Sequence, residues 1–343
     1  MEGLAGGMSK SPRGQPGDSS RRTQFNQEQI VFVIAVAIFL VFSVTLKGFL
    51  SAGNVLSMIQ NVCILGILGI GMAQVIIGRG IDLSMVATMV ISVAWFVAMV
   101  NRGVPLGLSL ALGFAFALTI GLTNGLLVAF AEIPAIFATL AMGTAVYGFG
   151  KCFLVETDVI NLVEGRFGLV PWTGGGQLYG IPAPVIVAAA IAAVTFLFLR
   201  FTRPGRFIFA TGDNPAAARI TGVPTRPLLV AQYVFSAAIA FMAGVVTAAA
   251  VNAVNTRQAN STLIYDVILV VVIGGVGLSG GKGSVRNVIV GTLLIGTVLN
   301  GMTIMNVPYA LQNIIKSMIL LIAIVVDSIV NPRDEQTSQQ GDI

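Results

Sequence analysis

Long stretches of this chain contain no charged residue. Asp, Glu, Lys and Arg are absent from residues 29–46, 48–78, 83–101, 103–131, 133–150, 167–199, 227–256, 267–281, 287–315 and 317–326. A helix needs about 20 apolar residues to cross the hydrocarbon core of a bilayer, and a charge at its centre costs about 2.5–3.5 kcal/mol. A soluble domain carries about 25% charged residues because its surface must be wetted. With 10% charged and 56% hydrophobic residues, the chain is predicted to be an integral membrane protein.

The charge-free stretches predict an all-α bundle of about ten transmembrane helices. The expected spans are 29–46, 55–78, 82–101, 105–130, 133–150, 183–201, 227–250, 262–278, 286–303 and 308–330. Apolar runs of this length, hydrophobic all round, differ from the short alternating strands of a membrane barrel. The transmembrane permeation domain is therefore expected over 29–330, between polar tails at 1–28 and 331–343.

The basic residues predict the orientation of these spans. With the N-terminus inside, thirteen Lys and Arg residues fall in inside segments and five in outside segments. Cytoplasmic loops carry an excess of such residues, so both termini are expected in the cytoplasm. The formal net charge of +5 then needs no nucleic acid as a partner. The segment 1–28 lacks the apolar core of a cleaved signal peptide and is expected to be a disordered, solvated tail.

Residues for metal or thiol chemistry are sparse. The chain has no His, and its two cysteines, Cys63 and Cys152, are far apart in the sequence. Two isolated cysteines form neither a disulfide framework nor a metal site. We expect no metal, no bound cofactor and no catalytic residue in this chain.

A glycine-rich segment over residues 271–284 resembles nucleotide-binding motifs only superficially. Its glycines fit G-x-G-x-x-G, but residues 287–315 contain no acidic residue to hold a ribose. The phosphate-loop pattern fails because Val276 stands at its first Gly and Gly283 follows Lys282, where Ser or Thr should bind magnesium. Small residues here instead favour a tight turn and close helix approach. The chain is not expected to hydrolyse ATP.

The longest cytoplasmic connection, residues 202–226, is expected to present a short helix. Asn214 is a good N-cap, and Pro215 fits the first helical position, where its missing N–H costs nothing. Helix-favouring residues continue to Ile220, and Gly222 ends the helix. Taken alone, the segment fits equally an ordinary basic loop and a rigid knob that another protein holds.

Several short motifs occur in a specific order along residues 30–330. Residues 78–84, Gly-Arg-Gly-Ile-Asp-Leu-Ser, are similar to a G-G-I-D-L-S hallmark. The other matching positions are Gly121-Leu-Thr-Asn-Gly125, Ile133-Pro-Ala-Ile-Phe-Ala-Thr-Leu140, Gly205-Arg206, Gly212, Asn214, Ala217-Ala218, Gly222, Asp266, Gly274-Gly275, Gly280-Gly281 and Asn300-Gly301. In order and spacing they resemble the permease subunits of bacterial ABC importers of the ribose, xylose and arabinose type. Met85-Val86 and Ile264 depart from the family pattern, which leaves substrate and gating open.

The resemblance implies a transport subunit in the bacterial inner membrane that is not itself an enzyme. Two copies, or one copy and a related partner, would form the pathway as a dimer in the lipid bilayer. Separate cytoplasmic ATPase subunits, which bind ATP and Mg, would hold coupling helices of the permeases, and an external solute-binding protein would deliver a sugar or polyol. The coupling positions implied in this chain are Gly212, Asp213, Asn214, Pro215, Ala217, Ala218, Arg219 and Gly222.

Neutral polar side chains inside the spans are candidates for contacting a sugar. They are Gln60, Asn61, Gln74, Asn124, Thr139 and Asn300. The competing interpretation is interhelical hydrogen bonding, which contributes about 0.6 kcal/mol per bond in a membrane. For each residue taken singly, interhelical bonding is favoured, and Asn124 beside Gly125 especially indicates packing.

Charged side chains inside the spans are expected to have structural or gating roles. Asp82 lies at a helix start near Arg79, where capping is expected. Asp266 begins the eighth span and is expected to pair with a basic residue that the sequence does not name. Lys316 lies within the last span and is expected to reach outward to the interface. The pair Gly274-Gly275 is assigned to the same structural or gating set.

The longest external connection, residues 151–182, is expected to form a lid or docking surface for the binding protein, or a passive interfacial loop anchored by Trp172. The alternative function for the whole chain is a proton-coupled secondary sugar transporter. Such proteins place titratable groups at mid-membrane. Here His is absent and the acidic residues fall near span ends, so the importer subunit is favoured.

Overall fold

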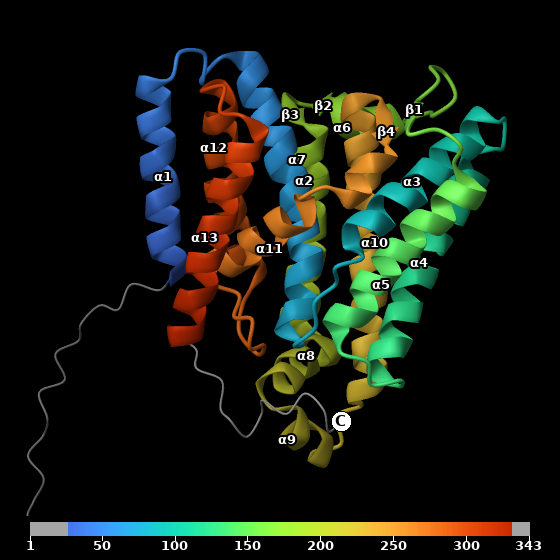
Figure 1. Ribbon diagram of the computed structural model, residues 1–343, viewed down its shortest axis with the longest axis vertical. Coiled ribbons are helices and arrows are strands. Elements are labelled where there is room, and N and C mark those ends of the chain that lie inside the picture. The colour runs from blue at the N-terminus through green and yellow to red at the C-terminus, as the bar shows by residue number, and fades with distance from the viewer. Residues whose placement is uncertain (1–26, 331–343) are drawn as a thin grey trace, which may run out of the picture.

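A computed structural model of the chain describes residues 27–330, and most of these residues are helical (Figure 1). The helices long and apolar enough to cross a membrane are α1 (Gln27–Thr45), α2 (Ala52–Ile77), α4 (Leu106–Ala129), α5 (Ala135–Phe149, continued by the π-turn η1, Gly150–Leu154), α7 (Ala183–Phe201), α10 (Thr225–Val251), α12 (Val285–Ile304) and α13 (Tyr309–Val330). Two shorter apolar helices are α3 (Met85–Asn101) and α11 (Leu263–Gly274). Each of the ten predicted spans corresponds to one of these helices, and the polytopic all-α prediction is confirmed.

The two short spans depend on the rest of the protein. Helix α11 has 12 residues and α3 has 17. At 1.5 Å per residue α11 covers about 18 Å, less than the roughly 30 Å hydrocarbon core. Helix α11 ends at Gly274, a few residues before the predicted edge at 278, because Gly275 adopts a left-handed φ of 98°. Irregular backbone at membrane depth is tolerated where protein surrounds it, and α11 is largely buried.

The two longest connections lie at opposite ends of the bundle (Figure 1). The strand-bearing end holds two small antiparallel sheets and a short helix, α6 (Val170–Gly175). One sheet pairs β1 (Val159–Asn161) with β4 (Ala253–Asn255), and the other pairs β2 (Gln177–Leu178) with β3 (Ile181–Pro182). The 3₁₀ turn η2 (Thr256–Asn260) follows β4 and packs on α3. The other end carries α8 (Arg203–Asp213) and α9 (Pro215–Ile220), and is called the α8–α9 end below.

Helices α2 and α10 form the centre of the bundle. The second half of α2 is almost entirely buried, and α10 packs against α2, α3, α4 and α6. Glycines let α4 approach α10 closely: a Cβ at Gly125 would lie 2.6 Å from the Cα of Val230, and one at Gly121 would lie 2.9 Å from the Cα of Val234. Small residues at helix interfaces are the usual means of close packing in lipid. The centre is therefore held by backbone proximity as much as by large side chains.

The periphery of the bundle is apolar and exposed. Helices α1 and α13 are the least buried of the membrane-length helices. Their exposed side chains include Val33, Val44, Ile314 and Leu321. A water-soluble protein rarely exposes apolar patches of this extent, whereas lipid tails cover them without cost. The surface therefore fits the prediction of a multi-pass membrane protein.

Candidate functional site

Helix α8 was not expected from the sequence, which predicted a single helix in the connection 202–226. The signals for α8 are present: the hydroxyl of Thr202 accepts a hydrogen bond from the Gly205 N–H at 3.1 Å, and Pro204 lies in the first turn. Glycine has a low intrinsic helix propensity, so Gly205 does not predict a helix here. The structure explains this glycine, because a Cβ there would lie 2.6 Å from the Cα of Leu199 on α7.

Helix α9 forms where the sequence predicted it. The side chain of Asn214 accepts a hydrogen bond from the Ala217 N–H at 3.0 Å, and Pro215 occupies the first turn. Ala218 is buried, whereas Ile220 is 88% exposed. Gly222 follows at a left-handed φ of 82°. The short helix thus exposes the apolar side chain of Ile220, whereas the Nε of Arg219 donates to the Thr225 hydroxyl at the start of α10, at 3.3 Å.

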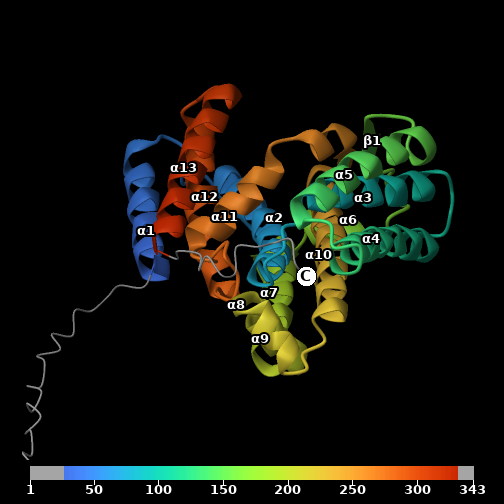
Figure 2. The same cartoon turned by 60° about the horizontal axis from the view of Figure 1, so that its bottom comes forward.

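The junction between α8 and α9 touches the end of α2 and the loop between α11 and α12. A Cβ at Gly212 would clash with the carbonyl oxygen of Ile77 and lie 2.5 Å from the amide nitrogen of Gly281. The Gly281 N–H also donates to the Ile77 carbonyl at 2.8 Å. Figure 2 shows α8 and α9 close to the ends of α2, α7 and α10. Three backbones therefore meet at one point, and no side chain fits at position 212.

Arg79 joins this junction to the turn that follows α2. Its Nε donates to the Gly212 carbonyl at 2.6 Å, and its Nη2 donates to the Asp213 carbonyl at 2.8 Å. These carbonyls lie at the C-terminal end of α8, where helix carbonyls lack partners within the helix and carry partial negative charge. Arg79 therefore caps α8 from a different part of the chain.

Asp82 lies close to the predicted helix start, and its carboxylate is bonded to two serines. Asp82 is 1% exposed and lies before α3, whose N-cap residue is Ser84. One carboxylate oxygen accepts from the N–H and the hydroxyl of Ser84, at 3.1 and 2.6 Å, and the other accepts from the Ser236 hydroxyl at 2.8 Å. Asp82 therefore fixes the turn before α3 to α10, whereas Arg79 binds carbonyls of α8.

Five of the six neutral candidates for the sugar pathway are bonded to other parts of the bundle. Gln60 donates to the Gly174 carbonyl, Gln74 exchanges hydrogen bonds with Gln232, Asn124 donates to Ser84, Thr139 bonds Ile81 and Leu83, and Asn300 exchanges bonds with Asn54. Asn61 is exposed and makes no side-chain hydrogen bond among residues 27–330. The structure thus does not gather the six residues into one site.

An ion pair lies within the bundle, between α11 and α13. The Lys316 ammonium lies 2.8 Å from one oxygen of Asp266 and 2.9 Å from the other. The side chains are 9% and 11% exposed, respectively. The expectation that Asp266 pairs with a basic residue is confirmed, and the expectation that Lys316 reaches outward is wrong. A buried carboxylate 50 positions away holds the ammonium inside, because an unpaired charge in lipid is costly.

The pair Gly274-Gly275 ends α11 and begins the loop to α12. A Cβ at Gly274 would lie 2.8 Å from the carbonyl carbon of Asn287, whose side-chain amide donates to the Gly274 carbonyl at 2.7 Å. A dinucleotide-binding motif follows a strand, whereas this segment follows helix α11. The interpretation of the glycines as a tight turn with close backbone approach agrees with this geometry.

The strand-bearing end is fastened by Asp158. Its two oxygens accept from Lys151 at 2.8 Å and from Arg257 at 2.7 Å, which joins η1 to η2 next to β1. The hydrogen bond from Lys151, which has the largest effect, and the one from Arg257 hold the pKa of the Asp158 carboxyl below its usual value. Helix α6 packs tightly on α10 nearby, because a Cβ at Gly174 would lie 2.6 Å from the Cα of Ala250. Part of the connection 151–182 is thus a packed cap on the bundle.

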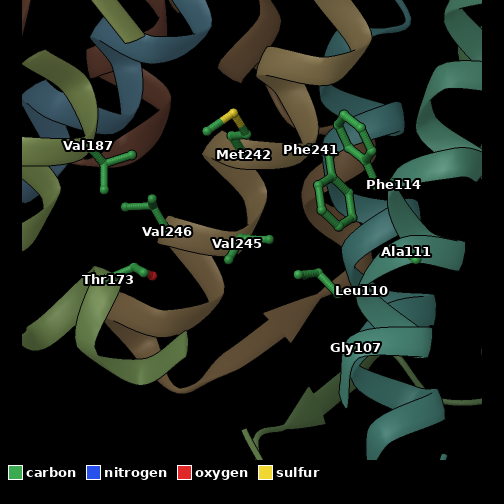
Figure 3. Close-up of a pocket in the computed structure, with 10 residues that line it drawn as sticks. All are labelled: Gly107, Leu110, Ala111, Phe114, Thr173, Val187, Phe241, Met242, Val245 and Val246. Carbon is green, nitrogen blue, oxygen red and sulfur yellow. The ribbon is translucent and has the colours of Figure 1, made fainter. Parts of the chain in front are cut away.

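One hollow in the bundle is apolar. It has a volume of about 410 Å³ and lies between α4, α6, α7 and α10 (Figure 3). Phe114 and Phe241 meet edge to face on one side at 5.5 Å between centroids, and Met242 and Val246 line another part. Thr173 is the only residue of its lining with a polar side chain. A sugar needs several hydrogen-bond partners, so this hollow does not fit a sugar site.

No candidate metal-binding site is present in the part of the chain that the structure describes. No group of three His, Cys, Asp or Glu residues within 27–330 is placed to hold a metal ion. Both cysteines are free, with Cys63 buried and Cys152 exposed. Two features of the described residues stand out. One is the contact of α8 and α9 with the end of α2, and the other is the set of charged and polar pairs inside the bundle.

Comparison with known families decides the class of protein. The family described as "Branched-chain amino acid transport system / permease component" matches residues 54–324. The chain belongs to this family. As a family member with eight membrane-length helices among its described residues, this permease is a multi-pass inner-membrane protein. Its place in the family agrees with the resemblance found in the sequence motifs.

Several named relatives cover most of the permease. The ribose import permease protein RbsC of Haemophilus influenzae is 26% identical over 307 residues, spanning 89% of this chain and 94% of the relative. The probable ABC transporter permease protein YphD of Escherichia coli is 30% identical and covers 92% of this chain and 93% of its own length. The galactofuranose transporter permease protein YtfT of Escherichia coli is 34% identical, covering 80% of both. No solved structure matched the chain.

Proposed function

We propose that this chain is the membrane-spanning subunit of an ATP-driven importer for a sugar or related polyol. The observation that carries the proposal is the α8–α9 unit, which protrudes from one end of the bundle and is joined to α2 through Gly212 and Arg79. A protruding element joined to a central helix is suited to transmit movement from a partner. Relatives named for ribose and galactofuranose transport support a sugar as substrate.

In this proposal the α8–α9 end faces the cytoplasm, and the segment 202–226 is the coupling loop. Arginines are concentrated there, which agrees with the positive-inside rule. Separate ATPase subunits, holding ATP and Mg, contact α9 around Ile220, which is 88% exposed. Their closure on ATP binding moves α8 and α9, and the bundle switches between inward- and outward-open states. The proposed contact positions are Gly212, Asp213, Asn214, Pro215, Ala217, Ala218, Arg219 and Gly222.

The strand-bearing end faces the outside in the same proposal. The segment 151–182 there receives the solute-binding protein that delivers the sugar. The Asp158 clasp, with Lys151 and Arg257, gives this end a defined shape. A second permease copy, or a related chain, completes the pathway.

Asn61 is the neutral candidate that we assign to the pathway or to its lining between two permease chains. The first half of α2 is partly exposed and the second half is buried, so the helix emerges from the bundle toward the strand-bearing end. Asn61 lies on that exposed part with its amide unbonded among the described residues. Gln60, Gln74, Asn124, Thr139 and Asn300 already bond elsewhere and are proposed as packing residues.

Reconstitution tests the proposal. The permease is co-expressed with a candidate ATPase and a candidate solute-binding protein from the same organism and placed in liposomes, and uptake of ribose, xylose and arabinose is measured with and without internal ATP. We expect uptake to need ATP and the binding protein and to survive a protonophore. Uptake that is independent of ATP but is abolished by the protonophore would instead establish proton-coupled transport. Failure of the chain to bind the ATPase would contradict the coupling assignment.

A further inference from the structure

Arg79 combines two features that rarely occur together without a reason. Its φ is 70°, in the left-handed region that favours glycine. Its side chain donates two hydrogen bonds, at 2.6 and 2.8 Å, to the last carbonyls of α8. A left-handed φ is uncommon for a residue other than glycine, and the two hydrogen bonds help to hold Arg79 in it.

The segment that begins at Arg79 is bonded to three further helices. Thr139 on α5 bonds the Ile81 carbonyl and accepts from the Leu83 N–H, at 3.1 and 3.0 Å. Asn124 on α4 donates to the Ser84 hydroxyl at 2.7 Å, and Ser236 on α10 donates to Asp82 at 2.8 Å. Residues 79–84 therefore form one bonded link from α8 to α4, α5 and α10.

A glycine of the loop between α11 and α12 makes room for the aliphatic part of the Arg79 side chain. A Cβ at Gly280 would clash with the Arg79 Cγ and lie 2.9 Å from the Gly212 carbonyl oxygen. The aliphatic part of Arg79 thus passes directly over the backbone of the loop between α11 and α12. A displacement of α8 would therefore strain or break the two bonds from Arg79 to the α8 carbonyls, unless residues 79–84 move with it.

We propose that Arg79 is a positioning residue that transmits movement of the α8–α9 unit to residues 80–84 and so to α4, α5 and α10. This inference rests on the proposed function, since the movement is the one that an ATPase partner would impose. A planar guanidinium suits the role, because it donates to two carbonyls in a fixed geometry, whereas the ammonium of lysine is a point donor.

The first experiment uses the permease alone in detergent and measures amide hydrogen exchange. Arg79→Gly removes the guanidinium and gives the left-handed position its preferred residue. We expect exchange of residues 210–218 to accelerate by about tenfold, as loss of charged-donor hydrogen bonds predicts. Asn306→Gly is the matched control, because Asn306 also has a positive φ, 53°, but lies in the turn between α12 and α13. Unchanged exchange in Arg79→Gly would show that no tether exists and would overturn the inference.

The second experiment uses the complex with the candidate ATPase, trapped with ATP and vanadate. In the wild type, trapping should change exchange of the amides of residues 80–84, whose N–H groups at Leu83 and Ser84 are bonded. Arg79→Gly should bind the ATPase but lose this response, Arg79→Lys should keep part of it, and Asn306→Gly should keep all of it. A full response in Arg79→Gly would overturn the inference. A wild-type chain that binds no ATPase would instead contradict the proposed function, and the tether would still be decided by the first experiment.

Discussion

The Lys316 ammonium on α13 and the Asp266 carboxylate on α11 lie 2.8 Å apart, with their side chains 9% and 11% exposed. Polar Thr262 and Asn313 and apolar Leu269 and Leu320 line the same small hollow as the pair. Helix α11 is short and needs partners to hold it at membrane depth. The ion pair therefore fastens a short span to the last helix of the bundle.

Breaking this pair on one side should destabilise the permease. Lys316→Met leaves a buried carboxylate unpaired, and we expect the free energy of unfolding to fall by about 3 kcal/mol. The double variant Asp266→Leu/Lys316→Met removes both charges and should recover most of the loss. Denaturant unfolding in detergent, followed by circular dichroism, measures both. A single variant as stable as the wild type would contradict a stabilising pair.

Two glycines of the coupling loop should respond differently to alanine. Gly212→Ala must push α8 away from the Ile77 carbonyl, so uptake should be nearly abolished. Gly222→Ala meets no neighbouring atom and strains only the backbone at φ 82°, at about 1 kcal/mol. We expect Gly222→Ala to retain most of the uptake of the reconstituted complex. An equal loss of uptake in both variants would contradict a role for the close backbone approach at Gly212.

The N-terminal cap of α9, formed by the Asn214 side chain, can be tested without changing the exposed side chains of the helix. Asn214→Ala removes the acceptor of the Ala217 N–H and should weaken this short helix by about 1 kcal/mol. Asn214→Asp keeps an acceptor and should restore it. Co-purification with the ATPase is the measurement, and we expect it to fall for Asn214→Ala and to remain for Asn214→Asp. If both variants bound equally, the cap would have no role in docking.

The Asp158 clasp should be sensitive to acid. Lys151 and Arg257 lower the pKa of Asp158 in the folded protein from its ordinary value of 3.8. The contribution of the clasp is then fully present above pH 3.8 and is lost as the pH falls through the lower folded value. Exchange at Ile160 and Val254, corrected for intrinsic rates, should therefore accelerate only below pH 3.8.

A neutral variant provides the control for this pH effect. Asp158→Asn lacks the charge at every pH, so its β1–β4 pairing should be loosened at neutral pH and show no further transition in acid. The same acid transition in Asp158→Asn as in the wild type would assign the effect to another group.

The sequence alone predicted much of the fold because partition into lipid depends on the summed hydrophobicity of one segment. The ten predicted spans agree with their helices to within a few residues at each end. Helix α11 ends before its predicted edge because Gly275 takes a left-handed conformation. Helix α8 was missed because Gly205 lowers helix propensity, and only contact with Leu199 makes a glycine necessary there.

The sequence by itself determined that the chain lies in lipid, where it crosses, where the charges of its loops concentrate, and that Asn214 starts a helix. Each of these depends on neighbouring residues alone. The tertiary structure decided that Lys316 turns inward to Asp266, that five neutral candidates are already bonded, and that Arg79 binds the end of α8. Such pairs join residues 50 and 133 positions apart, for Lys316 with Asp266 and Arg79 with Gly212. Which partners meet over such separations depends on how the helices pack.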